Sequence, residues 1–444
     1  MKRKITDRLI EWKKEDKKAL LIYGARQVGK TYIIEEFIKD NFDNVIKIDF
    51  AQNPSAIPHF INLKNKEEFY INVSLYGNIN LDNSVVFFDE IQELYNSNKK
   101  EEYTTDLISI IKSLVIDNRV RIILSGSMLG VTLNNIHFNP MGYLDAIKMY
   151  PLDFEEYLLA KNIAPSLIDE LKSCFEKKEK VPNQIHEKML SLFNEYIVIG
   201  GMPEVVKRYI ETSDISLVSN IQQTIINYYK SDITKYTPMK DRLLISEAYS
   251  LIPSELNSKN KRFIKTHIEY NSIKNIEMLE KYLWLKASGI ALPVYNVTNP
   301  ISPLKISEQR KTLKLFSSDI GLLNNQLLNV VEKVNFMKGN TTINYGAQYE
   351  NVIAQELNSH GYEELHYYNS KKNGEVDFIL ENKTKVIPIE IKSGKTNTQG
   401  YFDHKALNHL ISKYKYDNVY ILSSENIKKE DNITYLPIYM GMFL

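Results

Sequence analysis

Short apolar runs alternate with segments of helical spacing along the first 160 residues. The runs predict strands at 19–23, 45–50, 84–90, 120–127 and 146–150. Between them, apolar residues recur three and four positions apart, which predicts helices over 3–17 and 31–42. Because strands that alternate with helices usually form a parallel sheet with helices on both faces, we expect an α/β fold for this part.

The remainder of the chain divides by pattern into a helical stretch and a region where strands return. Residues 166–230 are predominantly helical, with a break at Gly200-Gly201 before Pro203. Residues 231–330 combine helices with a strand at 291–297, which suits a winged-helix-like module. Residues 331–444 predict a helix followed by strands, so we expect a C-terminal α/β domain there. With a core over 1–165, the sequence predicts four parts.

The first predicted strand runs directly into Gly24-Ala-Arg-Gln-Val-Gly-Lys-Thr31. This is the phosphate-loop pattern G-x-x-x-x-G-K-[ST], placed as required between a strand and a helix. Glycines let successive N–H groups surround an anion, and the helix start adds the positive end of its dipole. Lys30 would reach the β- and γ-phosphates, and Thr31 would place a hydroxyl on Mg²⁺. The residues expected to bind a nucleoside triphosphate are Gly24, Ala25, Arg26, Gln27, Val28, Gly29, Lys30, Thr31 and Tyr32.

Polar residues end two further strands of this core. Asp89 and Glu90 follow a buried run, and ligands of open α/β sheets bind at that end of the strands. Asp89 is expected to hold Mg²⁺ through its water shell, and Glu90 to activate the attacking water. Adjacent acids can also be solvated strand-end charges, but their position downstream of a phosphate loop favours catalysis. Ser125 and Ser127 are candidates to sense the γ-phosphate, with a plain strand-to-loop turn as the alternative.

A second group of polar residues lies in the C-terminal part. Asp377 and Glu390 fall on predicted strands joined by a turn, and Glu390 and Lys392 project from the same face because they are two positions apart. Two carboxylates and a lysine can hold Mg²⁺ and position a water for attack on a phosphodiester. Lys392 would orient or deprotonate that water, and Glu350, from the preceding helix, could complete the metal shell. The alternative is a fold whose metal site is idle or serves in binding.

Composition and charge change this interpretation little. The 444 residues are 43% hydrophobic and 25% charged, which is typical of a globular protein. A net charge of +1 gives no overall attraction to nucleic acid or membrane, so DNA contact needs a local patch. The basic cluster Lys259, Lys261, Arg262 and Lys265 is the candidate, with solvated surface as the alternative. The single Cys174 excludes an intrachain disulfide and fits a cytoplasmic setting, and no apolar run reaches the ~20 residues of a membrane span.

Four motifs resemble a large prokaryotic group, the AAA-type, STAND-related P-loop ATPases with a family-specific C-terminal region. They are Gly24–Thr31, Phe87–Gln92, Ile123–Ser127 and Tyr150–Leu158. The resemblance implies ATP as the nucleotide and an extra strand between the Asp-Glu strand and the phosphate-loop strand. It also implies that 166–230 is a lid in which a Gly-x-Pro element, Gly201 and Pro203, lies over the nucleotide, with the proline near the base. Many relatives carry Gly-Arg where this chain has Gly142-Tyr143, so no arginine role transfers there.

The C-terminal pattern resembles the D…E-x-K signature of the restriction-endonuclease-like fold, including Holliday-junction-resolvase-type members. Asp377, Glu390 and Lys392 match the signature, and Glu350 matches the helix carboxylate. The leading hypothesis is an ATPase whose nucleotide state controls a nuclease-like, DNA-associated domain. One alternative is a STAND-like switch whose inactive nuclease-like half is a scaffold for a protein partner. Another is a DNA-binding regulator without cleavage activity. ATPases of this class often assemble, so a homo-oligomer is compatible with each hypothesis.

Overall fold

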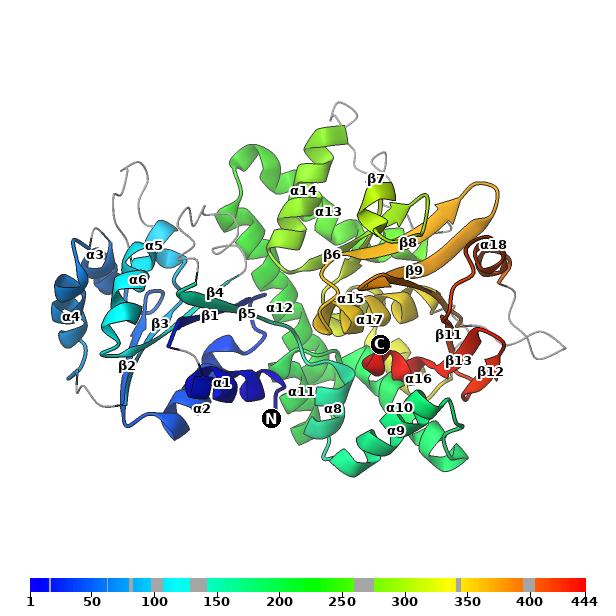
Figure 1. Ribbon diagram of the computed structural model, residues 1–444, viewed down its shortest axis with the longest axis horizontal. Coiled ribbons are helices and arrows are strands. Elements are labelled where there is room, and N and C mark those ends of the chain that lie inside the picture. Colours follow the sequence, from blue (N-terminus) through cyan, green and yellow to red (C-terminus); the bar gives the residue numbers. More distant parts are fainter. Residues whose placement is uncertain are drawn as a thin grey trace. The chain divides into compact units, whose positions relative to one another are not determined.

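The chain folds into two compact units, shown in Figure 1. The computed structural model describes residues 1–15, 17–61, 63–79, 83–96, 107–127, 142–258, 275–340, 345–393 and 404–444. The N-terminal unit comprises Lys2–Tyr150 with Ala287–Gly289, and the larger unit comprises Pro151–Lys286 and Ile290–Leu444 with Met1. Each unit contains one sheet. Among the described residues, no helix is long and apolar enough to cross a membrane.

The N-terminal unit is built on a five-stranded sheet in the order β2-β3-β4-β1-β5. Its strands are β1 (Ala19–Gly24), β2 (Asn44–Asp49), β3 (Ser84–Asp89), β4 (Arg121–Ser127) and β5 (Leu144–Met149). Every neighbouring pair is parallel. Strand β4 separates β3 from β1, so the predicted extra strand is confirmed. The sheet also confirms the α/β fold class.

Helices cover both faces of this sheet. They are α1 (Ile5–Glu15), α2 (Lys30–Asn41), α3 (Ile57–Phe60), α4 (Lys66–Ser74), α5 (Glu93–Asn96) and α6 (Leu107–Asp117), with the 3₁₀ turn η1 (Pro54–Ala56). Alternate residues of β3 point to opposite faces, as the strand period requires. Phe87 packs in a cluster with α1 and α2, whereas Phe88 packs in a cluster with α3, α4 and α6. All of β3 is therefore buried, which explains its unbroken apolar run.

The larger unit begins with a helical stretch. Its helices are α8 (Phe154–Ala160), α9 (Pro165–Lys177), α10 (Asn183–Ile199), α11 (Pro203–Thr212), α12 (Ile215–Tyr236), α13 (Met239–Asn257) and α14 (Asn275–Ala287). Helix α8 starts at Asp153, whose Oδ1 accepts a hydrogen bond of 2.9 Å from the Glu156 N–H. Helix α10 ends at Gly200, whose φ of 77° allows the sharp break predicted before Pro203.

An eight-stranded mixed sheet forms the rest of the larger unit, in the order β12-β13-β11-β10-β9-β8-β6-β7. The strands are β6 (Ala291–Val297), β7 (Glu308–Ser317), β8 (Leu365–Ser370), β9 (Gly374–Asn382), β10 (Lys385–Ile391), β11 (Val419–Ser423), β12 (Lys428–Glu430) and β13 (Ile433–Pro437). The accompanying helices are α15 (Ile320–Leu327), α16 (Val330–Met337), α17 (Gly346–Ser359) and α18 (Lys405–Tyr414), with the 3₁₀ turns η3 (Leu304–Ser307) and η4 (Ile438–Phe443). Strands β9 and β10 pair antiparallel, as the sequence predicts.

The strands of the middle region differ from the expectation for a winged-helix-like module. Strand β6 pairs antiparallel with β7 and parallel with β8, so both belong to the C-terminal sheet instead of forming a separate wing. Almost all of β6 is buried, and such a strand needs a partner on each side. The predicted divisions at residues 230 and 330 both fall inside the larger unit. The basic cluster at 259–265 lies outside the described residues.

Candidate nucleotide-binding site

The phosphate-loop segment joins β1 to α2 at the carboxyl end of the parallel sheet. Gly24 lies between Ser127 of β4 and Met149 of β5, and a Cβ built on it would lie 2.2 Å from the Met149 carbonyl oxygen. Gln27 and Gly29 have φ angles of 67° and 91°, and Gly29 is the N-cap of α2. This left-handed geometry turns the chain into the helix, whose first N–H groups lack intrahelical partners and favour an anion.

Lys30 is folded over the loop. Its side chain is buried, and its Nζ donates hydrogen bonds of 3.2 Å and 2.9 Å to the carbonyl oxygens of Gly24 and Ala25. Val28 is also buried, and its carbonyl accepts a 3.2 Å hydrogen bond from Arg3. Within the predicted set, Arg26, Gln27 and Tyr32 are exposed, whereas Gly29 and Thr31 are half-buried. An ammonium in this position is placed to bind phosphate oxygens in the loop.

Asp89 is fixed in orientation at the end of β3. It is 2% exposed, and its Oδ1 accepts hydrogen bonds from the Ser125 hydroxyl and, at 3.1 Å, from the Glu90 N–H. Lys47 Nζ lies 3.9 Å from the other carboxylate oxygen. The structure therefore joins Ser125 to Asp89, across the neighbouring strands β3 and β4. Whether Ser125 also senses a γ-phosphate stays a prediction.

Glu90 occupies a strained position beside Asp89. Its φ is 54°, in the left-handed region that residues other than glycine rarely adopt. Burial raises the pKa of its carboxyl above the usual value, although Lys30 and a hydrogen bond from Gln92 lower it in part. A raised pKa makes a carboxylate a better proton acceptor near neutral pH, as a general base requires.

Gln92 connects two of the predicted residues, and sequence reasoning assigned it no role. Its amide nitrogen donates to Glu90 Oε2, and its oxygen accepts a 3.1 Å hydrogen bond from the Ser127 N–H. Ser127 thus enters this network through its backbone. Gln92 is 3% exposed, and buried polar side chains are normally hydrogen-bonded. The available signal was its position two residues after Glu90, at the end of the motif Phe87–Gln92.

Gly201 and Pro203, the residues predicted to lie over the nucleotide, belong to the larger unit. The Gly201 N–H donates a 2.7 Å hydrogen bond to Asp319 Oδ2, and its carbonyl accepts one of 2.7 Å from the Leu152 N–H. Pro203 is the first residue of α11. Asp319 is also the N-cap of α15, and burial raises the pKa of its carboxyl to about 6. The role of Gly201 and Pro203 at the base stays a prediction.

Two of the four C-terminal residues predicted for the metal site, Glu350 and Asp377, are grouped around a lysine that the sequence did not indicate. Lys314 of β7 is fully buried, and its Nζ lies 3.1 Å from Glu350 Oε2 and 3.8 Å from Asp377 Oδ1. Its shortest ion pair, 2.6 Å, is with Glu375 Oε1, the residue two positions before Asp377. Burial alone would lower the pKa of Lys314, but the three carboxylates raise it above its usual value.

Glu390 and Lys392 form a separate pair beside this cluster. Lys392 Nζ lies 2.8 Å from Glu390 Oε1, as their shared strand face predicts, and the Ile391 N–H donates a 2.8 Å hydrogen bond to Asp377 Oδ2. Burial raises the pKa of Glu390, which Lys392 offsets in part. The other Glu390 oxygen, Oε2, is buried and accepts no hydrogen bond. In the described part of the chain, no group of three or more His, Cys, Asp or Glu side chains is arranged to hold a metal ion.

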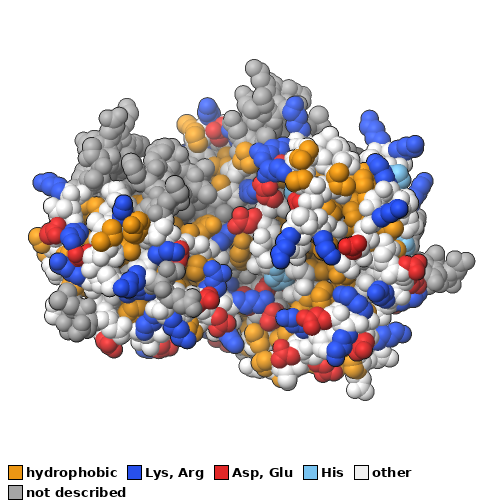
Figure 2. All heavy atoms as spheres, viewed as in Figure 1, with side chains coloured by type: hydrophobic (Ala, Val, Ile, Leu, Met, Phe, Trp, Pro, Cys, Tyr) orange, Lys and Arg blue, Asp and Glu red, His pale blue; other side chains and the backbone are white. Residues whose placement is uncertain are grey.

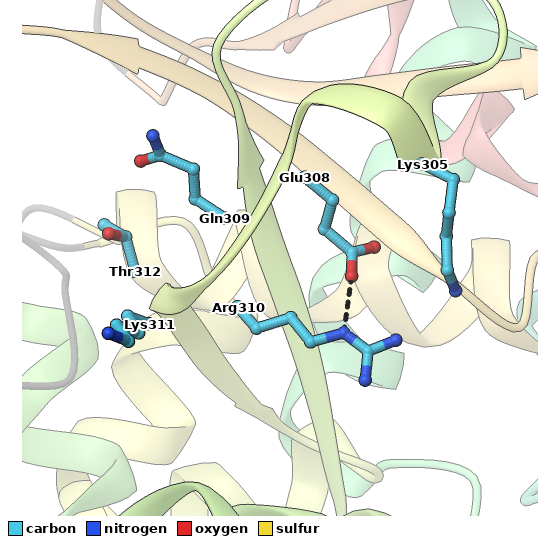
Figure 3. A pocket seen from close by; sticks show the side chains of 6 residues that line it. All are labelled: Lys305, Glu308, Gln309, Arg310, Lys311 and Thr312. Atoms are coloured by element: carbon cyan, nitrogen blue, oxygen red, sulfur yellow. Dashed lines mark hydrogen bonds and ion pairs between the residues drawn. The ribbon is translucent and has the colours of Figure 1, made fainter. Parts of the chain in front are cut away.

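A hollow of about 690 Å³ lies between η3 and the start of β7 (Figure 3). Its lining is Lys305, Glu308, Gln309, Arg310, Lys311 and Thr312, and Arg310 pairs with Glu308 at 2.9 Å. None of the predicted site residues lines it. On the face shown in Figure 2, basic and acidic side chains are interspersed, in keeping with the net charge of +1.

Comparison with known proteins assigns the first third of the chain. Residues 16–158 match a family described as an AAA domain. Together with the phosphate loop, the match supports an AAA-type ATPase and confirms that part of the resemblance. Residues 190–333 and 345–440 match two domains of unknown function, DUF8612 and DUF4143, so the restriction-endonuclease-like assignment stays a prediction.

The chain is similar to an uncharacterized protein of Methanocaldococcus jannaschii, 27% identical over 94% of this chain and 84% of the relative. Among solved structures, the Walker-type ATPase of Pyrococcus abyssi is 14% identical over 73% of this chain and 94% of its own, with a TM-score of 0.42. The Aeropyrum pernix Orc1 protein in complex with DNA is 10% identical over 75% and 91%, with a TM-score of 0.29. A STAND protein with a tetratricopeptide repeat sensor from Pyrococcus horikoshii is 13% identical over 80% and 48%, with a TM-score of 0.27.

Proposed function

We propose that the AAA-type domain binds ATP with Mg²⁺ at residues 24–32 and hydrolyses it. The observation that carries this proposal is the buried Lys30 ammonium, folded over a loop that leads into the N-terminus of α2, where helices favour an anion. The loop, Asp89 and Glu90 all lie at the carboxyl end of parallel strands, where α/β folds bind ligands. In this proposal Lys30 binds the β- and γ-phosphates.

The remaining side chains of the site take complementary roles. Thr31 and Asp89 would hold Mg²⁺, which neutralises phosphate charge when bound, and the Ser125 hydroxyl keeps Asp89 in one orientation. Glu90 accepts the proton of the attacking water. Gln92 restrains the Glu90 carboxylate through its own hydrogen bond to the Ser127 N–H. The functional pair is thus Asp89 for the cation and Glu90 for the water.

Equilibrium binding of ATP in the presence of Mg²⁺ tests the first step. Lys30→Ala removes the ammonium, and we expect the affinity for ATP to fall at least tenfold. Lys39→Ala is the matched control because Lys39 lies on the same helix, α2, with an exposed side chain. Equal affinities of the Lys30→Ala variant and the control would refute binding at this loop.

We further propose that the nucleotide state acts on the C-terminal domain through the larger unit. The turn at Gly201 is hydrogen-bonded to Asp319, at the end of the segment that follows β7. Glu356 of α17 accepts hydrogen bonds of 3.0 Å from the Phe154 N–H and 3.1 Å from the Tyr196 hydroxyl. These contacts join the predicted lid to the C-terminal sheet, so a displacement of the lid would move both.

Two roles for the C-terminal domain follow from the sequence, and one observation favours each. The buried Glu390 Oε2, which accepts no hydrogen bond, supports a Mg²⁺-dependent nuclease-like site with Asp377 and Lys392 that acts on DNA. The ion pairs of Lys314 with Glu350 and Asp377 support the alternative, an inactive nuclease-like scaffold for a protein partner. The predicted set of Glu350, Asp377 and Glu390 does not suit one metal ion, because Lys314 already pairs with Glu350 and Asp377.

Incubation with supercoiled plasmid and Mg²⁺ separates these roles. The scaffold proposal predicts no nicking by the wild-type chain, with or without ATP. Nicking by the wild type that disappears in Asp377→Ala would establish the nuclease instead. Retention on immobilised DNA at low salt, where phosphate contacts are strongest, tests DNA association without cleavage.

A further inference from the structure

We propose that Lys314 takes the place of a divalent cation in the C-terminal domain. Its ammonium lies among Glu350, Glu375 and Asp377 and offsets part of their negative charge, so the carboxylate cluster is stable without metal. This inference deepens the scaffold role proposed above and rests on the same cluster, but it does not depend on ATP binding.

The charged groups come from three segments that are distant in sequence. Lys314 lies on β7, Glu350 on α17, and Glu375 and Asp377 on β9. Glu375 and Asp377 are two positions apart and therefore share one face of their strand. The Lys314 Nζ lies 2.6 Å, 3.1 Å and 3.8 Å from the oxygens of Glu375, Glu350 and Asp377. One ammonium thus bridges three carboxylates, as a metal ion would.

Because these groups are buried, their pairing with Lys314 contributes strongly to the stability of the cluster. The side chain of Lys314 is 0% exposed, and those of Glu350 and Asp377 are 3% and 10% exposed. Buried charges are strongly unfavourable unless they are paired, and carboxylates this close repel one another without a cation between them. An ammonium carries three N–H donors, and that of Lys314 lies within 3.1 Å of the Glu375 and Glu350 oxygens and 3.8 Å from Asp377 Oδ1. Glu375, at 24% exposed, is the member that solvent helps to stabilise.

The charged and polar groups beside the cluster have partners of their own. Lys392, the cation of the predicted metal site, lies 2.8 Å from Glu390 Oε1. The second oxygen of Asp377 accepts a hydrogen bond from the Ile391 N–H. Glu350 and Asp377, which the sequence places in a metal shell, are therefore held by donors of the protein itself. The aromatic ring of Tyr367 lies 5.1 Å from the Lys314 ammonium and adds a further favourable contact.

Thermal unfolding of the full chain without nucleotide, in EDTA and in millimolar MgCl₂, tests this role. Lys314→Met removes the ammonium and keeps most of the side-chain volume. We expect its midpoint in EDTA to be several degrees below that of the wild type, and Mg²⁺ to restore a large part of the loss. The wild-type midpoint should be the same in both solutions. Mg²⁺ that stabilises the wild type as much as the variant, or a variant that gains nothing from Mg²⁺, would overturn the proposal.

Lys333→Met provides the matched control. Lys333 is also fully buried, but its ammonium donates to the neutral oxygens of Ser219, Gln222 and Asn325 at 2.8 Å, 2.8 Å and 2.6 Å. Its replacement disturbs a buried lysine of the same unit without exposing a carboxylate cluster. We therefore expect no response of this variant to Mg²⁺. A response equal to that of Lys314→Met would show that the metal effect is unrelated to the cluster.

A third variant covers the case in which Lys314→Met does not fold. Lys314→Met combined with Glu350→Gln and Glu375→Gln removes the ammonium together with two of its carboxylates. The proposal predicts a folded protein whose midpoint is insensitive to Mg²⁺. Failure of this variant to fold would refute charge neutralisation as the role of Lys314. The plasmid assay is independent of these midpoints, so the two proposals can fail separately.

Discussion

The strained backbone at Glu90 provides a prediction that separates function from stability. Glu90 has a φ of 54°, and a Cβ in this left-handed region costs about 1–2 kcal/mol. Burial also raises the pKa of its carboxyl, so the ionised side chain is disfavoured by its surroundings. Strain of this kind is retained at functional sites because the surrounding structure enforces it. Removal of the side chain should therefore stabilise the fold while it abolishes hydrolysis.

Comparison of Glu90→Gly with Glu90→Ala isolates the backbone contribution. Both variants lose the carboxylate and its hydrogen bond from Gln92, but only glycine also relieves the Cβ conflict. Glycine gains additional freedom in the unfolded chain, which costs about 0.5–1 kcal/mol. At the middle of both ranges, the difference leaves Glu90→Gly more stable than Glu90→Ala by about 0.8 kcal/mol.

Urea unfolding of the full chain, followed by circular dichroism, measures this difference. ATP hydrolysis should be lost in both variants. An alanine variant that is as stable as the glycine variant would refute the assignment of strain to this residue. Retention of wild-type hydrolysis in either variant would refute the role of Glu90 as the base.

Three further predictions concern the two units separately. Gly24→Ala places a Cβ 2.2 Å from a backbone oxygen of β5. This variant should bind ATP more weakly, and its free energy of unfolding should fall by about 1–3 kcal/mol. Gly77→Ala is the control: its Cβ lies 2.9 Å from a side-chain atom, and its ATP affinity should change little. Gly201→Ala places a Cβ 2.0 Å from the Leu152 carbonyl oxygen and should lower the thermal midpoint of the larger unit. The affinity of this variant for ATP is the second readout. Burial lowers the pKa of Lys333 to about 8, so the unfolded chain binds more protons than the folded one between pH 8 and about 10.4. The free energy of unfolding should therefore rise with pH in this interval relative to Lys333→Met, and equal pH profiles in urea unfolding would contradict the lowered pKa.

The sequence predicted the nucleotide-binding core well because its signals are local. The strand before Gly24, the helix after it and the buried run before Asp89 can each be predicted from about ten consecutive residues, and the structure confirms these elements. Parallel strands then bring the ends of β1, β3 and β4 to one edge, so the residues at those ends come together. The sequence did not predict a role for Gln92 because its two hydrogen bonds depend on the turn after Glu90.

Long-range pairing explains what the sequence did not reveal in the larger unit. The pattern at 291–297 predicted a strand correctly, but a strand does not identify its partners, and β6 pairs with β8, which begins at Leu365, as well as with β7. Lys314 lies in an alternating stretch and resembles a solvent-facing residue. It is buried in the folded chain beside Glu350 and Glu375, which are 36 and 61 positions away in sequence. The sequence placed the acidic residues correctly on their elements but did not reveal the cation between them.

Phosphate release from ATP is the most direct test of the central claim. The account predicts Mg²⁺-dependent hydrolysis by the wild-type chain and at least a hundredfold slower hydrolysis by Glu90→Gln, since a general base contributes about 10²–10⁴-fold. Glu90→Gln should still bind ATP with wild-type affinity. Hydrolysis by Glu90→Gln at the wild-type rate, or no hydrolysis by the wild type under conditions where ATP is bound, would contradict the proposed ATPase.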